Sequence, residues 1–283
     1  MRRPLIAVTG ATGAVGSRVA RGLSERGVRQ RLVVRDAARA PALDGAEVRQ
    51  ASGFGAGEEL RAALDRVHTL LLIPAAEAPD RVQQHTTAVD AAVAAGVQRI
   101  VYLSFLGAAP DATFTLARDH WATEEHIRAT GVPFTFERMS IYMDFIPSMV
   151  ADDGAIRGPA GDGRVAAILR DDVAAAIVAV LTSGDHDAAT YDLTGPAAFS
   201  LAEAAAVMAE VTGKPIRFED ETDEEAYASR AGLGAPDWEV RGWVTSYQAI
   251  RDGSLDVVSP AVLELTGRAP TSLADHLRAN AAS

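Results

Sequence analysis

Short apolar segments alternate with longer segments of helical periodicity along the first 140 residues. The apolar segments have strand length, and the segments between them repeat their apolar positions every three or four residues. This alternation predicts a parallel sheet covered by helices on both faces. The expected strands are 5–8, 32–34, 47–50, 69–73, 100–104 and 133–137, and the expected helices are 14–25, 58–65, 80–95 and 116–130.

The pattern becomes less regular after residue 150. A glycine-rich turn region is expected over 151–164, followed by a helix over 171–183, a short strand in "TYDLTG", a helix capped by Ser200 and a strand in "KPIRF". The acidic run 219–225 is expected to be a solvated helix start. The predicted fold class is α/β: a Rossmann-type doubly wound parallel sheet over 1–150, intertwined with a smaller C-terminal substrate lobe over 151–283.

Three glycines follow the first expected strand at three-residue spacing, in "VTGATGAVG". Gly10 permits a tight turn, Gly13 lets the backbone approach a pyrophosphate, and Gly16 lets helix and strand pack closely. The start of the next helix offers unpaired N–H groups to phosphates. This context, strand before and helix after, predicts a dinucleotide-binding loop.

The end of the second expected strand bears on the choice of dinucleotide. Arg35 directly follows Val34, and a guanidinium there can bind a 2′-phosphate, which indicates NADP. The alternative is that Arg35 is a solvated charge paired with Asp36, which leaves NAD open.

The usual short-chain dehydrogenase pair, a tyrosine four residues before a lysine, is absent from the sequence. The only lysine is Lys214, and Glu210 stands four residues before it. The chain has no cysteine, so disulfides, thiolate metal sites and cysteine nucleophiles are excluded. His120 and Glu124 at i, i+4 are a weak metal signal, and neither a metal nor a flavin is expected.

The composition is that of a soluble globular protein, with 48% hydrophobic and 23% charged residues. A net charge of −11 argues against nucleic acid or an anionic membrane as the main partner. The apolar stretch after the first arginines is too short for a signal peptide. We expect a cytoplasmic monomer or homodimer that acts on a small molecule.

Long stretches resemble the NmrA-like, atypical short-chain dehydrogenase/reductases, in particular the quinone oxidoreductase 2 and triphenylmethane reductase branch. The resemblance runs essentially from end to end. It is carried by "VTGATGAVG", "VVRDAARA", "LLLIP", "QQHTTAVDAAVAAGVQRIVYLSFLGA", "LARDHWATEEHIRATGVPFTFERMSIYMD", "GPAGDGRVAAILRDDVAAA" and "LTGRAPTSLADHL".

The resemblance implies site residues. Those that would bind coenzyme are Thr9, Gly10, Thr12, Gly13, Ala14, Val15, Gly16, Arg35, Ile73, Pro74, Ser104 and His120. Those that would serve catalysis as hydrogen-bond donors are His120, Ser104 and Tyr142. The branch tends to have asparagine after an acidic residue where this chain has Phe145 after Asp144, which leaves the substrate open.

Each catalytic candidate has a structural alternative. His120 would be a surface residue paired with Glu124, Ser104 a hydroxyl bonded to backbone, and Tyr142 a packing residue. His85 is expected on a helix surface.

The expected activity is hydride transfer from NADPH to a quinone or similar conjugated electrophile. Such an acceptor does not need the strong acid that the missing tyrosine would supply. The main alternative is a non-catalytic NADP(H)-binding redox sensor that acts through a protein partner. A nucleotide-sugar epimerase is disfavoured because that chemistry needs the tyrosine.

Overall fold

A computed structural model describes residues 4–281 and divides the chain into two compact units. The first unit comprises the residues up to 105, 119–138 and 173–191, and the second comprises 106–118, 139–172 and the residues from 192 onward. Each unit is therefore assembled from separate stretches of sequence. The simpler division at residue 150 stays a prediction.

A seven-stranded sheet forms the first unit, in the order β3-β2-β1-β4-β5-β6-β9. The strands are β1 Ile6–Thr9, β2 Gln30–Val34, β3 Ala46–Gln50, β4 Thr69–Leu72, β5 Arg99–Phe105, β6 Phe134–Met139 and β9 Ala189–Leu193. Neighbouring strands from β3 to β5 pair in parallel, with Thr9 opposite Val33 and Leu72 opposite Tyr102. The six strands expected in the first 140 residues are thus confirmed, with bounds shifted by one or two residues.

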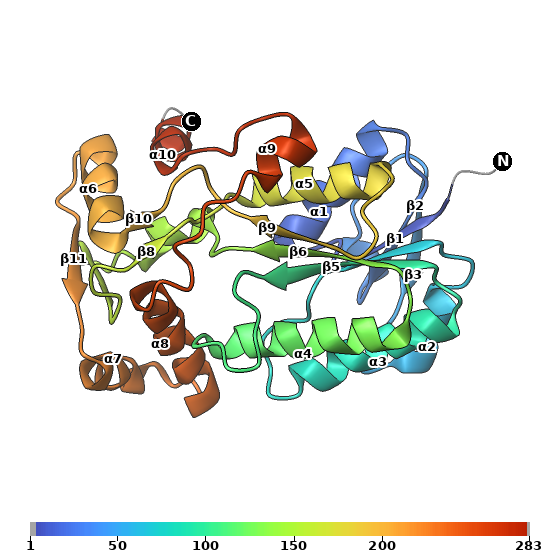
Figure 1. Cartoon of the computed structure of the whole chain (residues 1–283), viewed down its shortest axis with the longest axis horizontal. Coiled ribbons are helices and arrows are strands. Elements are labelled where there is room, and N and C mark those ends of the chain that lie inside the picture. The colour runs from blue at the N-terminus through green and yellow to red at the C-terminus, as the bar shows by residue number, and fades with distance from the viewer. Residues whose placement is uncertain (1–3, 282–283) are drawn as a thin grey trace. The chain divides into compact units, whose positions relative to one another are not determined.

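Helices lie on both sides of this sheet, with α1 and α5 on one side and α2, α3 and α4 on the other (Figure 1). Their bounds are α1 Ala14–Glu25, α2 Gly57–Ala63, α3 Arg81–Ala94, α4 Thr115–Thr130 and α5 Arg170–Thr182, and a 3-10 turn, η1, covers Ala37–Arg39. The predicted doubly wound arrangement is confirmed, because parallel strands joined by helices bury both faces of a sheet.

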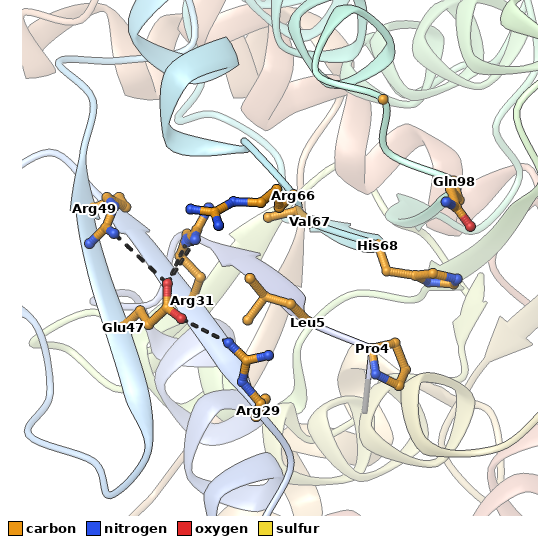
Figure 2. Close-up of a pocket in the computed structure, with 11 residues that line it drawn as sticks. Pro4, Leu5, Arg29, Arg31, Glu47, Arg49, Arg66, Val67, His68 and Gln98 are labelled. Carbon is orange, nitrogen blue, oxygen red and sulfur yellow. Dashed lines mark hydrogen bonds and ion pairs between the residues drawn. The ribbon is translucent and has the colours of Figure 1, made fainter. Parts of the chain in front are cut away.

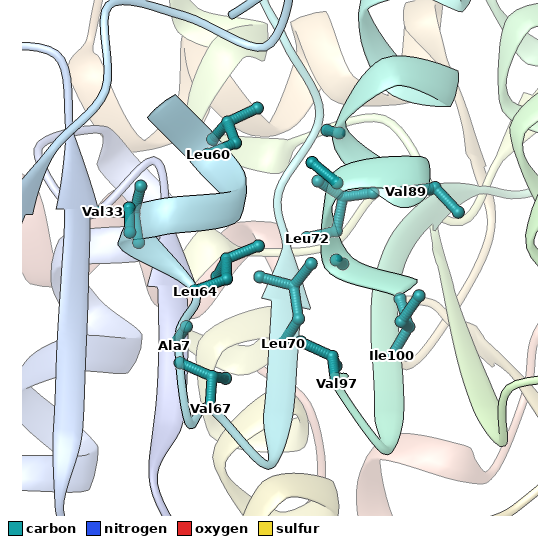
Figure 3. Close-up of a cluster of buried hydrophobic side chains, with 14 of the residues drawn as sticks. Ala7, Val33, Leu60, Leu64, Val67, Leu70, Leu72, Val89, Val97 and Ile100 are labelled. Carbon is teal, nitrogen blue, oxygen red and sulfur yellow. The ribbon is translucent and has the colours of Figure 1, made fainter. Parts of the chain in front are cut away.

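The core on the α2–α4 side joins alternate residues of the strands to the inner faces of the helices (Figure 3). Ala7, Leu70 and Leu72 contribute from β1 and β4, and Leu60 and Val89 from α2 and α3. Residues two apart in a strand point to the same face of the sheet, and residues three or four apart in a helix lie on the same face of the helix. The apolar positions of the strands therefore meet the apolar faces of the helices here. This packing fixes the strand ends that carry the candidate site.

The second unit contains two small sheets. Strand β7 pairs in parallel with β11, and β8 pairs antiparallel with β10. The elements are η2 Met143–Met149, β7 Ala155–Gly158, β8 Arg164–Val165, β10 Phe199–Ser200, α6 Leu201–Thr212, β11 Arg217–Asp220, α7 Asp223–Arg230, η3 Ala231–Leu233, α8 Asp237–Arg251, α9 Ala261–Thr266 and α10 Leu273–Ala281. The prediction of turns alone over 151–164 is wrong, because β7 lies there and β8 begins there. These strands are too short to show an alternating pattern.

Two helix starts in the second unit were expected from sequence and are confirmed. Ser200 and Glu203 form a reciprocal capping box at the start of α6, and Thr222 and Glu225 form another at α7. Of the acidic run 219–225, Glu219 and Asp220 lie in β11, and the residues from Asp223 form the first turn of α7, so the expected helix start is confirmed for the second half of the run. Within residues 4–281, none of the helices has the length and apolar composition needed to cross a membrane.

Candidate functional site

The glycine loop connects β1 to α1 through a tight backbone contact. Gly10 has a φ of +62°, and its carbonyl accepts a hydrogen bond from the Gly13 N–H at 2.8 Å. A Cβ placed on Gly16 would lie 2.2 Å from the Gly10 carbonyl oxygen, so only glycine fits there. Gly13 caps α1 without a side-chain hydrogen bond.

The outer part of this loop is open to solvent: Thr12, Gly13 and Ala14 are exposed, whereas Val15 and Gly16 are buried. The first N–H groups of a helix have no partner within the helix and carry a partial positive charge. The loop thus has the two features that a pyrophosphate requires, close backbone approach and unpaired N–H donors.

Thr9 fixes the ends of β1 and β4 relative to each other. Its buried hydroxyl contacts the Leu71 carbonyl at 3.1 Å and accepts a hydrogen bond from the Ile73 N–H at 2.9 Å. Ile73 in turn packs against Gly10, since a Cβ on that glycine would lie 3.3 Å from its side chain. Pro74 follows at the same edge and is half-buried. The Thr9 side chain therefore positions Ile73 and Pro74, which are predicted to line the coenzyme site.

Arg35 lies at the same edge of the sheet as the glycine loop. Thr9 is opposite Val33 in the β1–β2 ladder, so Arg35 comes just beyond the level of Gly10. Its side chain is exposed, and within residues 4–281 it forms no ion pair with Asp36. The Asp36 carboxylate instead accepts a hydrogen bond from the Ala38 N–H at 2.9 Å. The alternative of an Arg35–Asp36 pair is wrong for this structure.

Ser104 and Glu124 form a buried hydrogen bond between β5 and α4. Ser104 Oγ donates to Glu124 Oε1 at 2.6 Å, and both residues are 0% exposed. Arg138, from β6, donates to both oxygens of the same carboxylate at 2.8 and 2.6 Å, and Arg128 donates at 3.1 Å. The structural alternative, in which Ser104 bonds to backbone, is therefore wrong: its proton is held by a carboxylate.

His120 is buried and has both ring nitrogens engaged. Its Nε2 lies 3.3 Å from Arg81 Nη2, and its Nδ1 lies 2.9 Å from the Tyr102 hydroxyl. A guanidinium can only donate, so Nε2 accepts and Nδ1 carries the proton. The alternative of a surface histidine paired with Glu124 is wrong, since His120 is 2% exposed and bonds to other partners.

His85 is also buried, which corrects the expectation that it lies on a helix surface. Its Nε2 accepts a hydrogen bond from the Ala75 N–H at 3.0 Å, and its Nδ1 lies 2.9 Å from Thr123 Oγ1. Arg81 donates from Nε to the Ala75 carbonyl at 3.1 Å. Two residues of α3 thus hold the loop that follows β4, next to Ile73 and Pro74.

Burial controls the protonation of both histidines. Desolvation, reinforced by the neighbouring Arg81 charge, lowers the pKa of His85 to about 3. The same two causes hold the pKa of His120 well below its usual value. Both rings are therefore neutral at physiological pH. Sequence reasoning missed Arg81 and Tyr102, and it paired Glu124 with the wrong residue, His120. The local signal for Arg81 was its i, i+4 spacing from His85, which places the two on one face of a helix.

Tyr142 lies in the second unit, immediately before η2. The Arg170 guanidinium carbon stands 4.3 Å from the centre of its ring, in a cation–π contact. Asp144 accepts a hydrogen bond from the Arg170 N–H at 3.0 Å and so fixes the start of α5. Burial is the main cause that raises the pKa of Tyr142 to about 12, so the phenol keeps its proton at neutral pH.

The chain is similar to reductases along its whole length. It is 31% identical to an NAD(P)H azoreductase of Xenophilus azovorans, with 99% of both chains covered. The crystal structure of the NADPH-dependent quinone oxidoreductase QOR2 of Escherichia coli, complexed with NADPH, matches 97% of this chain and 99% of its own at 32% identity, with a TM-score of 0.89. The Citrobacter sp. triphenylmethane reductase complexed with NADP(H) matches 98% of this chain and 99% of its own at 31% identity, with a TM-score of 0.86.

A family model describes most of the chain. The model of the NmrA-like family matches residues 2–235, which include the whole glycine loop and the β5–α4 contacts. Together with the full-length similarity, this match confirms the resemblance seen in the sequence. The chain belongs to the NmrA-like family, among relatives that are NAD(P)H-dependent reductases.

Proposed function

We propose that this chain is an NADPH-dependent reductase that transfers a hydride to a quinone or a similar conjugated electrophile. The observation that carries the proposal is the similarity over 97% of the chain to a quinone oxidoreductase complexed with NADPH. The glycine loop supports it independently, because its exposed backbone and the start of α1 suit a dinucleotide pyrophosphate. When bound, NADPH supplies the hydride from its nicotinamide ring.

Arg35 supports the choice of NADPH over NADH. Its guanidinium is exposed beside the glycine loop, and one oxygen of the neighbouring Asp36 carboxylate accepts a hydrogen bond from the Ala38 N–H. A carboxylate that binds the ribose favours NAD, whereas an exposed guanidinium at the end of the second strand can bind a 2′-phosphate. We therefore assign the 2′-phosphate contact to Arg35.

Ser104 is fully buried in this structure, and we propose that it becomes a coenzyme contact that accepts hydrogen bonds when the residues that cover it move aside. In the β4–β5 ladder Tyr102 is opposite Leu72, so Ser104 comes level with Pro74 at the carboxyl edge. Its single proton points to Glu124, which leaves only lone pairs for a ligand. An amide N–H, such as that of the nicotinamide carboxamide, would complement this hydroxyl. We therefore propose an acceptor role in place of the predicted donor role.

His120 is proposed as a positioning residue. Its one N–H is used by the Tyr102 hydroxyl, and its lone pair by Arg81. It holds Arg81 where that guanidinium can also bind the Ala75 carbonyl, and so stiffens the loop after β4. Tyr142 remains the candidate donor to a substrate oxygen, because its phenol is neutral at physiological pH and carries one O–H donor.

The test is NADPH consumption by the purified protein with a panel of quinones, azo dyes and cationic dyes. NADH and an Arg35→Ala variant are run alongside, with Arg21→Ala, another exposed arginine, as the matched control. Loss of a charged hydrogen bond predicts that kcat/KM for NADPH falls about tenfold to a hundredfold in Arg35→Ala, with NADH turnover unchanged. Tight NADPH binding without turnover on any acceptor would favour the redox-sensor alternative.

A further inference from the structure

A cavity of about 600 Å³ lies in the first unit, at the opposite edge of the sheet from the glycine loop (Figure 2). Its walls come from the amino ends of the parallel strands: Leu5 precedes β1, Arg29 precedes β2, and His68 precedes β4. Gly10 and Arg35 lie beyond the carboxyl ends of the same strands. The cavity is therefore separate from the proposed coenzyme site. Its size is within the range of about 300 to 1000 Å³ that small-molecule sites occupy.

Four arginines and one carboxylate line this cavity. Figure 2 shows the Arg29, Arg31 and Arg49 side chains converging on Glu47, at nitrogen–oxygen distances of 3.1, 2.7 and 3.9 Å. The Arg31 hydrogen bond is the main cause that lowers the pKa of Glu47, so the carboxylate is ionised at neutral pH. One negative charge is thus shared among three guanidinium groups, while the chain as a whole carries −11.

The four arginines have different environments. Arg31 is buried and donates to the Ala63 and Asp65 carbonyls as well as to Glu47, so it belongs to the framework. Arg49 and Arg66 have side chains that are 52% and 84% exposed, and Arg66 pairs with Asp65. These two can turn toward a ligand without breaking the core.

We propose that this cavity binds a small multivalent oxyanion, such as a triphosphate group. Guanidinium forks match the oxygen geometry of phosphates, and several forks around one cavity favour a ligand with several adjacent negative charges over a monovalent ion. Arg29, Arg49 and Arg66 supply the contacts, and Glu47 holds the cluster together through Arg31. The coenzyme does not account for this cluster, because the proposed function places its phosphates at the glycine loop, beyond the other ends of the same strands.

The test is a calorimetric titration of the full-length protein with inorganic triphosphate, with NADP⁺ present to fill the coenzyme site. Saturable binding is expected in the wild type. Arg49→Gln and Arg66→Gln are each expected to weaken it about tenfold or more, since each removes charged hydrogen bonds. Arg21→Gln, an exposed arginine of α1 that does not line the cavity, is the matched control and leaves Kd unchanged.

Three results would overturn the site: no saturable binding, displacement of triphosphate by NADP⁺, or equal affinity in the Arg49→Gln/Arg66→Gln double variant. The last would mean that Arg49 and Arg66 serve only to pair with Glu47 and Asp65. Chloride at matched ionic strength controls for general screening. If NADP⁺ itself fails to bind, the proposed function is refuted, whereas the arginine variants still report on this cavity.

Discussion

Ser104 and Glu124 face each other across the buried contact between β5 and α4, with Oγ and Oε1 2.6 Å apart. The carboxylate also accepts two hydrogen bonds from Arg138 and one from Arg128. A fully desolvated carboxylate is stable only when such partners compensate it. Glu124 therefore connects α4 to β5 and β6, and it sets the direction of the Ser104 hydroxyl.

Replacing Glu124 should destabilise the protein far more than replacing its neighbour. Glu124→Gln leaves the Arg138 and Arg128 charges without their buried counterion, which predicts a loss of about 3–5 kcal/mol in the free energy of unfolding. Glu125 pairs with Arg128 at the exposed surface, so Glu125→Gln should cost less than about 1 kcal/mol. Urea denaturation measures both values. Equal losses would show that the buried carboxylate has no special role.

Ser104→Ala tests the proposed acceptor role. It removes one hydrogen bond to Glu124 while the arginine contacts remain, so stability should fall by only about 1–3 kcal/mol. If the hydroxyl accepts from the coenzyme, KM for NADPH should rise about tenfold while KM for the electron acceptor changes little. Steady-state kinetics separates the two constants. Ser24→Ala, at the far end of α1, serves as the control.

Gly16→Ala should disrupt the glycine loop, because Gly16 is buried and packs against the backbone of Gly10. The new Cβ would lie 2.2 Å from the Gly10 carbonyl, and both backbones would have to move apart. The expected cost is about 1–3 kcal/mol of stability, together with loss of NADPH binding. Gly53→Ala is the matched control, because a Cβ there meets nothing within 4 Å. Thermal unfolding and coenzyme fluorescence report the two effects, and normal NADPH affinity in Gly16→Ala would contradict the geometry.

Glu137 makes stability depend on pH. It is fully buried in β6, neither carboxyl oxygen has a hydrogen-bond partner among residues 4–281, and burial raises its pKa to about 8 despite Arg99. Between about pH 4.5 and 8 the folded state holds a proton that the unfolded state releases. The stabilising contribution of Glu137 is therefore lost as pH rises, by up to about 1.4 kcal/mol per pH unit.

Glu137→Gln removes this titration. The free energy of unfolding of the variant, relative to the wild type, should increase as pH rises from 5 to 8 and then stay constant. Urea denaturation at several pH values measures the difference. A difference that is independent of pH would mean that Glu137 is ionised in the folded protein.

The two buried histidines should both be neutral with the proton on Nδ1. Nitrogen NMR distinguishes this tautomer, and His85→Gln and His120→Gln variants assign the signals. Because folding lowers both pKa values, the unfolded state binds protons first, and stability is lost as pH falls below about 6.5. An imidazolium signal from either residue in folded protein near pH 6 would contradict the hydrogen bonds that Nε2 of each ring accepts.

The local pattern of the sequence determined most of the fold. Strands β1 to β6, helices α1 to α4 and the caps at Ser200 and Thr222 depend on side chains one to four residues apart, and that pattern is readable directly. The glycine loop was readable for the same reason, since the backbone requirements at Gly10 and Gly16 lie within one turn. The order of strands then placed Arg35 at the same edge of the sheet.

The tertiary structure alone decided which polar side chains meet. Spacing suggested that His120 pairs with Glu124. In the folded protein His120 instead contacts Tyr102 and Arg81. Glu124 accepts hydrogen bonds from Ser104 and Arg138. The cavity arginines come from the start of β2, from β3 and from the loop before β4, which the fold brings together. Such partners are far apart in sequence, and a desolvated charge or hydroxyl takes whichever partner the packed strands bring within reach. The periodicity of the sequence predicts which face of a helix or strand is buried, but it does not predict which residues of other elements that face will contact.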